Sequence, residues 1–106
     1  MSITSDIIRG HTETIILALL ERGDSYGYMV NKSIAAATDN RYELKEATLY
    51  SAFRRMETDG LIRSYWGDEA TGARRRYYAI TDTGTLTLRR NRDDWQTAKS
   101  IIDAIL

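Results

Sequence analysis

The chain has no cysteine, no proline and a single histidine, His11, among its 106 residues. These absences exclude disulfides, thiolate nucleophiles and metal sites built from several Cys or His ligands. One histidine in a helix that packs against a core is a poor base for the Ser and Thr residues present. No Gly-rich phosphate loop occurs either. The sequence therefore predicts a protein that is not an enzyme and that uses no cofactor and no metal.

Long apolar runs and an excess of charge of one sign are also missing. The longest apolar stretch, Ile15 to Leu20, is much too short to span a bilayer, and no signal-peptide pattern opens the chain. We therefore expect a cytoplasmic protein with no membrane partner. Its 15 basic and 15 acidic residues cancel to a formal net charge of zero, so binding to nucleic acid has to depend on local clustering of charge.

Hydrophobic periodicity predicts two helices in the first part of the chain. The first should run from Ser5 or Asp6 to about residue 22, before Gly23, with apolar residues on more than one side. Such a helix is usually buried between two sets of neighbours. The second helix should follow directly, with Asp24 or Ser25 as its N-cap.

The remainder predicts a helix over 45–59, two β-rich runs around a polar loop within 61–81, and a closing helix over 82–106. Helix, helix, helix, hairpin, helix is the element order of a winged helix-turn-helix. We therefore expect an α+β, mostly helical fold, with this domain over 1–81. The closing helix over 82–106 is interpreted as a C-terminal dimerisation helix that packs with the first helix.

The helix over 45–59 has two unlike faces at 100° per residue. One is apolar and should face the core: Leu49, Ala52, Phe53 and Met56. The other carries small, hydroxyl-bearing and basic residues that suit entry into a DNA major groove: Ala47, Tyr50, Ser51, Arg54, Arg55 and Thr58. The alternative is a solvated helix whose arginines pair with its own acidic residues.

Three adjacent arginines, Arg74, Arg75 and Arg76, follow the polar loop of the hairpin. Alternation along a strand sends Arg74 and Arg76 to one side and Arg75 to the other, so at least one should point outward. Gly72 allows the backbone to approach a phosphate closely, and the planar guanidinium group suits phosphate. The alternative is a solvated turn in which Asp68 and nearby acids neutralise the cluster. We interpret it as a phosphate-binding wing.

Coiled-coil-like spacing marks the closing helix, with apolar residues at Leu88, Trp95, Ala98, Ile102 and Ile105. The polar Asn91 occupies the expected seam position between the first two and could fix the pairing of two helices. An amphipathic helix at the end of so small a domain must cover something. A second copy of the chain is the simplest candidate, so we expect a homodimer.

The segments "ATLY", "RMETDGLI" and "GARRRYYAIT" resemble the PadR family of winged-helix transcriptional regulators. The resemblance covers essentially the whole chain. It implies a homodimer that reads a pseudo-palindromic double-stranded DNA operator with two recognition helices, while the wings contact the flanking backbone. Asn31 and Lys32, on the second predicted helix, are further expected phosphate contacts. The implied DNA-binding residues are Thr48, Tyr50, Ser51, Arg54, Arg55, Gly72, Arg74 and Arg75.

The single closing helix, its tryptophan and the segment "SYWGDE" are similar to the short subgroup of the family, in which multidrug-binding members repress a drug-efflux transporter. That similarity implies a flat aromatic or hydrophobic effector stacked on Trp95 at the dimer centre. At two positions near this site, the multidrug-binding members carry an acidic and an aromatic residue where this chain has Lys99 and Arg92. A preference for cationic drugs is therefore left open. The implied ligand-binding residues are Trp95, Ile7, Gly10, Glu13, Thr14, Leu17, Ala98, Lys99 and Ile102.

The leading hypothesis is therefore a ligand-responsive DNA-binding repressor that controls an efflux transporter and its own gene. One alternative is a winged-helix dimer that binds DNA but has a filled interface around Trp95 and no effector. The other is a protein-docking module whose arginine-rich wing binds an acidic partner.

Overall fold

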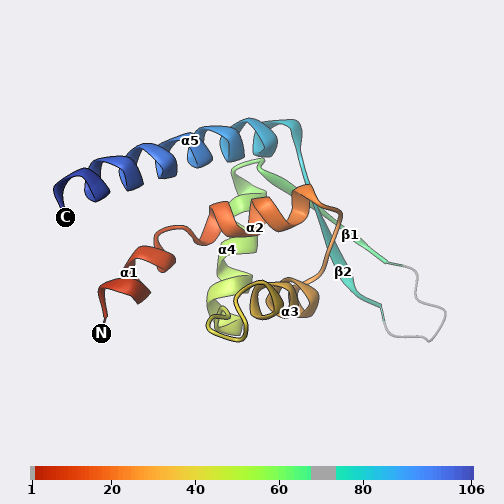
Figure 1. The fold of residues 1–106 in the computed structure, drawn as a ribbon. Helices are drawn as coiled ribbons and strands as arrows, with labels where there is room; N and C mark the ends of the chain where they lie inside the picture. The colour runs from red at the N-terminus through yellow and green to blue at the C-terminus, as the bar shows by residue number, and fades with distance from the viewer. Residues whose placement is uncertain (1, 68–73) are drawn as a thin grey trace.

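The computed structural model of the protein describes residues 2–67 and 74–106. Its elements are α1 (Ile3–Arg9), α2 (Thr12–Glu21), α3 (Gly27–Ala37), α4 (Glu46–Thr58), β1 (Ile62–Trp66), β2 (Arg76–Ile80) and α5 (Asp82–Ile105). Helices α2, α3 and α4 enclose one core, the antiparallel hairpin flanks α4, and α5 runs across α2 (Figure 1). This is the mostly helical winged-helix fold that the element order predicts. No helix within the described ranges is long and apolar enough to cross a membrane.

The core is centred on the chain's single phenylalanine, Phe53 of α4. Its ring is fully buried and stacks on Tyr78 of β2, with ring centroids 3.9 Å apart. The four apolar residues predicted to face inward from α4 are all buried, and the six residues assigned to its other face are all exposed. The two-faced character of this helix is therefore confirmed.

The predicted first helix is in fact two helices, because the helix is interrupted at Gly10 and His11. His11 donates a hydrogen bond from Nδ1 to the carbonyl oxygen of Ile7 at 2.6 Å, and the Thr12 hydroxyl donates to the carbonyl oxygen of Arg9 at 2.8 Å. These side chains satisfy carbonyl groups at the end of α1 that lack a helical N–H partner. Glycine's poor helix propensity favours a break at this point.

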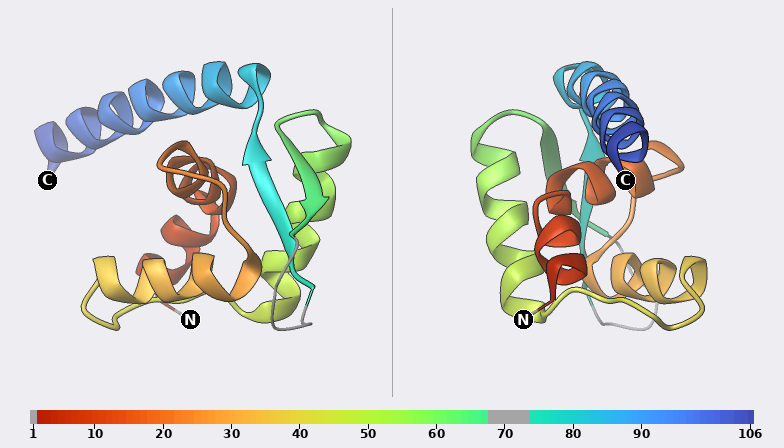
Figure 2. Two further views of the ribbon diagram at one scale, coloured as in Figure 1. Left: turned by 90° about the vertical axis from the view of Figure 1, so that its right-hand side faces the viewer. Right: turned by 60° about the vertical axis from the view of Figure 1, so that its left-hand side comes forward.

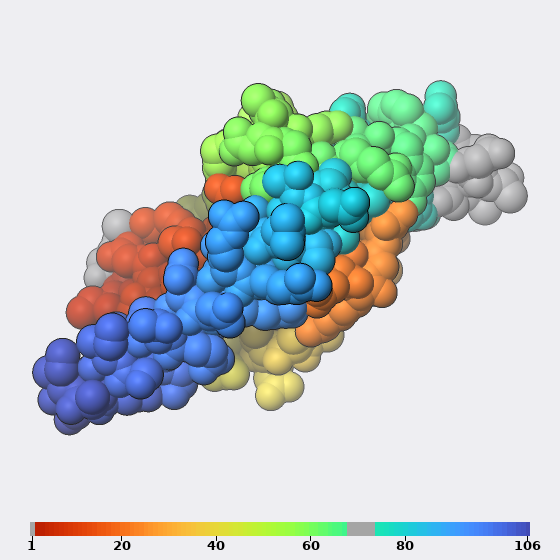
Figure 3. All heavy atoms as spheres, turned by 90° about the horizontal axis from the view of Figure 1, so that it is seen from above, coloured from red at the N-terminus to blue at the C-terminus, as the bar shows by residue number. Residues whose placement is uncertain are grey.

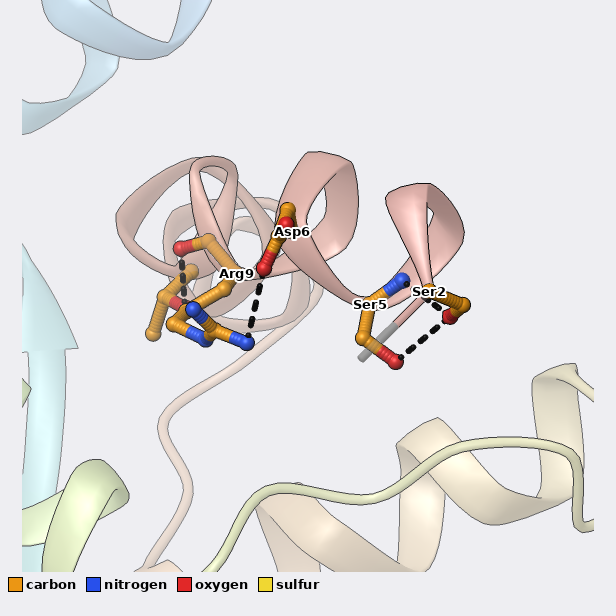
Figure 4. A network of polar contacts seen from close by, with 5 residues as sticks. Ser2, Ser5, Asp6 and Arg9 are labelled. Carbon is orange, nitrogen blue, oxygen red and sulfur yellow. Dashed lines mark hydrogen bonds and ion pairs between the residues drawn. The ribbon is translucent and has the colours of Figure 1, made fainter.

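Short local contacts hold α1 together (Figure 4). The Ser2 hydroxyl accepts a hydrogen bond from the Ser5 N–H at 3.2 Å and caps the helix, and Arg9 pairs with Asp6 at 3.1 Å. No residue of α1 is buried. The helix therefore contributes little to the core of its own chain.

The prediction that Asp24 or Ser25 caps the second helix is wrong, since α3 begins at Gly27 with Tyr26 as its N-cap. Ser25 instead pairs with Tyr78 as an extra strand position: the Ser25 N–H donates to the Tyr78 carbonyl at 3.1 Å, and the Tyr78 N–H donates back at 2.7 Å. Asp24 accepts a hydrogen bond from the Tyr65 hydroxyl, which raises the pKa of that phenol. Both residues thus brace the hairpin.

The junction between the hairpin and α5 depends on Gly84. Thr81 caps α5 by accepting the Gly84 N–H at 3.0 Å, while its own hydroxyl donates to the Gly60 carbonyl at 2.6 Å. A Cβ atom at position 84 would collide with the carbonyl oxygen of Leu61. Glycine is therefore required there because two backbone segments approach closely.

The two halves of α5 have different surroundings. Leu88 is fully buried in the core, Asn91 donates to the Thr14 hydroxyl at 2.9 Å, and Arg92 pairs with Glu21 at 3.0 Å. Within the single chain, the side chain of Asn91 thus links α5 to α2. Every residue from 93 to 106 is exposed. This half of α5 extends away from the rest of the molecule (Figure 2). The whole molecule is therefore elongated, with extents of 54 × 30 × 21 Å.

Candidate nucleic-acid interface and ligand groove

Four of the predicted DNA-binding residues lie on one surface formed by α4 and the hairpin. An open cleft of about 940 Å³ separates these two elements. Tyr50 and Arg54 line it from α4, and Arg74 and Arg75 line it from the segment just before β2. Gly72 lies outside the described residues. The structure therefore brings together predicted residues of the helix and of the wing.

Positive charge is concentrated in this cleft. Among the residues that the structure describes, its lining holds four arginines, Arg54 and Arg74 to Arg76, and one carboxylate, that of Glu57. The floor is aromatic: Tyr26, Tyr28, Tyr50, Trp66 and Tyr78. Burial raises the pKa of the Tyr78 phenol, so this ring is neutral at ordinary pH. A chain with no net charge thus presents a local cationic surface of the kind that attracts phosphate.

Aromatic rings hold the three adjacent arginines apart. The guanidinium carbon of Arg75 lies 4.8 Å from the ring centre of Tyr26, whereas those of Arg74 and Arg76 lie 5.3 Å and 5.9 Å from the ring of Trp66. The neighbouring ring therefore differs between Arg75 and the other two arginines, although all three side chains line the cleft. Arg76 also pairs with Glu57 at 3.4 Å, which attaches the wing to α4.

A second hollow, of about 530 Å³, lies between α4 and the α1–α2 junction. Thr48, Ser51, Arg54 and Arg55 line it together with Arg9 of α1. Nothing in the local sequence around Arg9 indicates a role next to α4, because the two are joined only by the packing of the helices. The predicted contact surface therefore gains one arginine.

Arg55 has a partner in the free chain. Its Nε lies 3.3 Å from the Glu13 carboxylate of α2, and both side chains are partly exposed. An exposed pair of this kind contributes only about 0–1 kcal/mol. Glu13 therefore holds Arg55 only loosely.

Tyr50 and Asn31 are placed by packing within the chain. The Tyr50 ring meets Phe53 edge-on at 5.8 Å, and its hydroxyl lies over Gly27, where a Cβ atom would collide with it. About 39% of Tyr50 stays exposed. The Asn31 amide donates a hydrogen bond to the Leu44 carbonyl oxygen and accepts one from the Leu44 N–H, both at 2.8 Å. A structural role therefore accounts for this residue.

A second candidate site is a groove of about 770 Å³ between the α1–α2 junction and the exposed half of α5. In Figure 3, α1 (red) and the end of α5 (blue) lie at the same end of the molecule. Seven of the nine predicted ligand-binding residues line this groove: Ile7, Gly10, Thr14, Trp95, Ala98, Lys99 and Ile102. The other two do not. Leu17 is fully buried in the core, and Glu13 is directed to Arg55.

Trp95 forms the aromatic wall of this groove. It is 39% exposed and meets His11 edge-on, with ring centroids 5.0 Å apart and an interplanar angle of 81°. His11 and Trp95 are far apart in the sequence, so no local pattern indicates this contact. Lys99 pairs with Asp103 one turn along α5 at 2.9 Å. Among the described residues, no cluster of three or more His, Cys, Asp or Glu side chains could hold a metal ion.

Comparisons with known proteins agree with this architecture. The profile of the transcriptional regulator PadR-like family matches residues 16–90. The structure of a transcriptional regulator from Clostridium thermocellum is 48% identical, with 96% of each chain covered and a TM-score of 0.88. A PadR family transcriptional regulator from Eggerthella lenta is 31% identical, with 98% of this chain and 88% of that chain covered and a TM-score of 0.85.

Among curated proteins, an uncharacterized protein from Lysinibacillus sphaericus is 42% identical over 104 residues, which are 98% of this chain and 95% of the relative. The matches therefore cover 88–96% of each relative. The chain belongs to the PadR-like family of DNA-binding transcriptional regulators.

Proposed function

We propose that this protein is a homodimeric repressor that binds a pseudo-palindromic operator with two copies of α4 and two wings. The observation that carries the proposal is the gathering of four arginines in one cleft beside α4, in a chain of zero net charge. In this arrangement the wing arginines contact phosphates and set the position of the protein. Thr48, Tyr50 and Ser51 then face the base edges in the major groove.

Dimerisation is supported by the apolar surface left uncovered at one end of the molecule. Neither α1 nor the part of α5 beyond Arg92 contains a buried residue. The large apolar side chains exposed on these two segments are Ile3, Ile7, Trp95, Ile101, Ile102 and Ile105. An uncovered apolar surface of this kind marks an interaction site, and a second copy related by a two-fold axis covers it symmetrically.

We further propose that flat aromatic or hydrophobic compounds bind in the Trp95 groove and change the affinity for the operator. The groove combines an exposed indole with the apolar side chains of Ile7, Ala98 and Ile102. The ligand would act by changing the spacing of the two α4 helices. Its effect is bounded by its difference in affinity between the two dimer conformations. The proposed targets are an efflux transporter gene and the repressor's own gene.

The DNA interface is tested by Arg75→Ala and Tyr50→Ala. Arg75→Ala should weaken binding to all duplexes and lower the slope of log affinity against log salt by about 0.9, since one phosphate contact is lost. Tyr50→Ala should mainly reduce discrimination between operator and unrelated DNA, by about 1–3 kcal/mol. The measurement is fluorescence anisotropy against salt, with an operator duplex obtained by in vitro selection and a mixed-sequence duplex.

The matched control is Arg89→Ala, which removes an exposed arginine of α5 that lines neither arginine-rich hollow. It should leave both affinities unchanged. Parent-like binding by Arg75→Ala and Tyr50→Ala alike would show that the contact surface lies elsewhere.

The ligand groove is tested with Trp95→Leu and acridine orange as the probe, in the absence of DNA. In a Trp66→Phe background, Trp95 is the only tryptophan, so its fluorescence should be quenched saturably by the dye. Equilibrium dialysis should show binding weakened about tenfold in Trp95→Leu, because stacking on an aromatic ring contributes about 1–3 kcal/mol. Absence of saturable quenching, with equal dye uptake by both proteins, would favour the alternative of a filled interface.

A further inference from the structure

We propose that Trp66 is a positioning residue for DNA binding, whose indole ring holds Arg74 in place to bind a phosphate. The proposal rests on the DNA interface proposed above and adds a residue that does not itself have to touch DNA. It explains how three adjacent arginines can be kept in a usable arrangement at the base of the wing.

Burial gives no reason for a tryptophan at this position. Trp66 is the last residue of β1 and is 56% exposed. It lies opposite Arg76 in the antiparallel register, and the Gly67 N–H donates to the Arg75 carbonyl at 2.7 Å just beyond this pair. The backbone on both sides of the indole is therefore fixed. The ring is presented on the same side of the hairpin as the side chains of Arg74 and Arg76.

The two arginines near Trp66 have different partners. Arg76 donates to the Ser64 hydroxyl at 2.8 Å and pairs with Glu57, so its charge serves to attach the wing to α4. Arg74 forms no ion pair within the described residues, and its guanidinium carbon lies 5.3 Å from the centre of the Trp66 ring. Arg74 is therefore the arginine of this pair whose charge remains available to a ligand.

Stacking on an indole ring leaves a guanidinium group able to bind phosphate. The attraction uses the flat face of the cation, whereas its N–H donors lie in the plane and point outward. The ring also restricts a long side chain that would otherwise lose its rotamer freedom on binding. Trp66 thus reduces the cost of ordering Arg74 and does not compete with phosphate.

The test compares Trp66→Leu with Trp66→Phe, each made with Arg74 present and in an Arg74→Ala background. Leucine keeps an apolar side chain without a π face, whereas phenylalanine keeps the face. Affinities are measured by anisotropy for the selected operator duplex and a mixed-sequence duplex. Trp66→Leu should bind both about two- to fivefold more weakly, the value expected for an exposed cation–π contact, and Trp66→Phe should recover most of the loss.

The decisive comparison is the double-mutant cycle. If Trp66 acts through Arg74, Trp66→Leu should cause no further loss once Arg74 is alanine. An equal loss in both backgrounds, or no loss in either, would overturn the inference. Failure of Arg74→Ala itself to weaken binding would instead contradict the proposed DNA interface, so the two failures can be told apart.

A measurement that leaves Trp66 intact covers the case in which its variants fold poorly. In a Trp95→Phe background, Trp66 is the only tryptophan and reports directly on the base of the wing. Its emission should change when the mixed-sequence duplex is added, and this change should be absent in Arg74→Ala. The same change with and without the Arg74 side chain would count against the inference.

Discussion

Phe53→Ala should lower the free energy of unfolding by about 3–5 kcal/mol, the usual cost of truncating a buried phenylalanine. The ring is fully buried, stacks on Tyr78 of β2 and meets Tyr50 of α4 edge-on. The hairpin and α4 contact the Phe53 ring from two sides. The cavity left by its removal therefore cannot close unless the wing separates from α4. A small domain has only about 5–15 kcal/mol of total stability, so a large fraction would be lost.

Urea unfolding followed by circular dichroism measures this loss, with Thr58→Ala on the exposed face of α4 as the matched control. The control should change the stability by no more than about 0.5 kcal/mol. DNA affinity should fall together with stability in Phe53→Ala, since the same ring sets the position of the wing relative to Tyr50. A loss below about 1 kcal/mol would mean that the cavity closes, and it would argue against a rigid attachment of the wing.

Elements with a strong local pattern were predicted well from the sequence. The inward residues of α4, such as Leu49 and Met56, repeat with the helical period, and Gly60 follows directly where the helix ends. The hairpin was recognisable because alternation and turn residues are also local signals. In each case neighbouring residues carried the information.

The errors at the start of the chain have a different origin. Its apolar period continues through Gly10 and His11, so the pattern alone could not show that His11 and Thr12 cap carbonyls and end α1. Ser25 has the composition of an N-cap, but its backbone pairs with Tyr78. Here side-chain hydrogen bonds and distant strand pairing decide the structure.

The candidate sites show the same division. The arginines of the wing were evident from the sequence, whereas the rings that hold them, Trp66 and Tyr26, depend on strand register and on the position of α3. Leu17 was assigned to the ligand groove through the resemblance to multidrug-binding family members. Periodicity cannot tell which apolar side packs against the chain's own core, and Leu17 lies on that side.

The start of α2 connects the ligand groove with the DNA-binding helix. Two successive residues point to different partners: Glu13 contacts Arg55 of α4, and Thr14 accepts a hydrogen bond from Asn91 of α5. Thr14 and Asn91 also line the groove. A ligand that moves the start of α2 would therefore disturb the contact between Glu13 and Arg55. This gives the proposed ligand response a physical route through contacts within one chain.

Ile105→Asp should convert the proposed dimer to a monomer and weaken operator binding by a factor of about 100 or more. Ile105 is 78% exposed in the single chain, so an aspartate there leaves the fold intact. In a dimer that covers the end of α5, the same carboxylate would be buried without a partner, which is costly. Linked half-site contacts raise affinity by about 10²–10⁴, and a monomer loses this gain.

Sedimentation velocity measures the mass, and anisotropy measures binding to the selected operator and to a duplex that carries one half-site. Ser100→Asp is the matched control, because it adds the same charge to an exposed position on another side of α5. It should remain dimeric and bind the operator as the parent does. Ile105→Asp should bind the half-site as well as a parent subunit does, since α4 and the wing are unchanged. A dimeric Ile105→Asp with parent-like operator affinity would mean that the two recognition helices are held together by another surface.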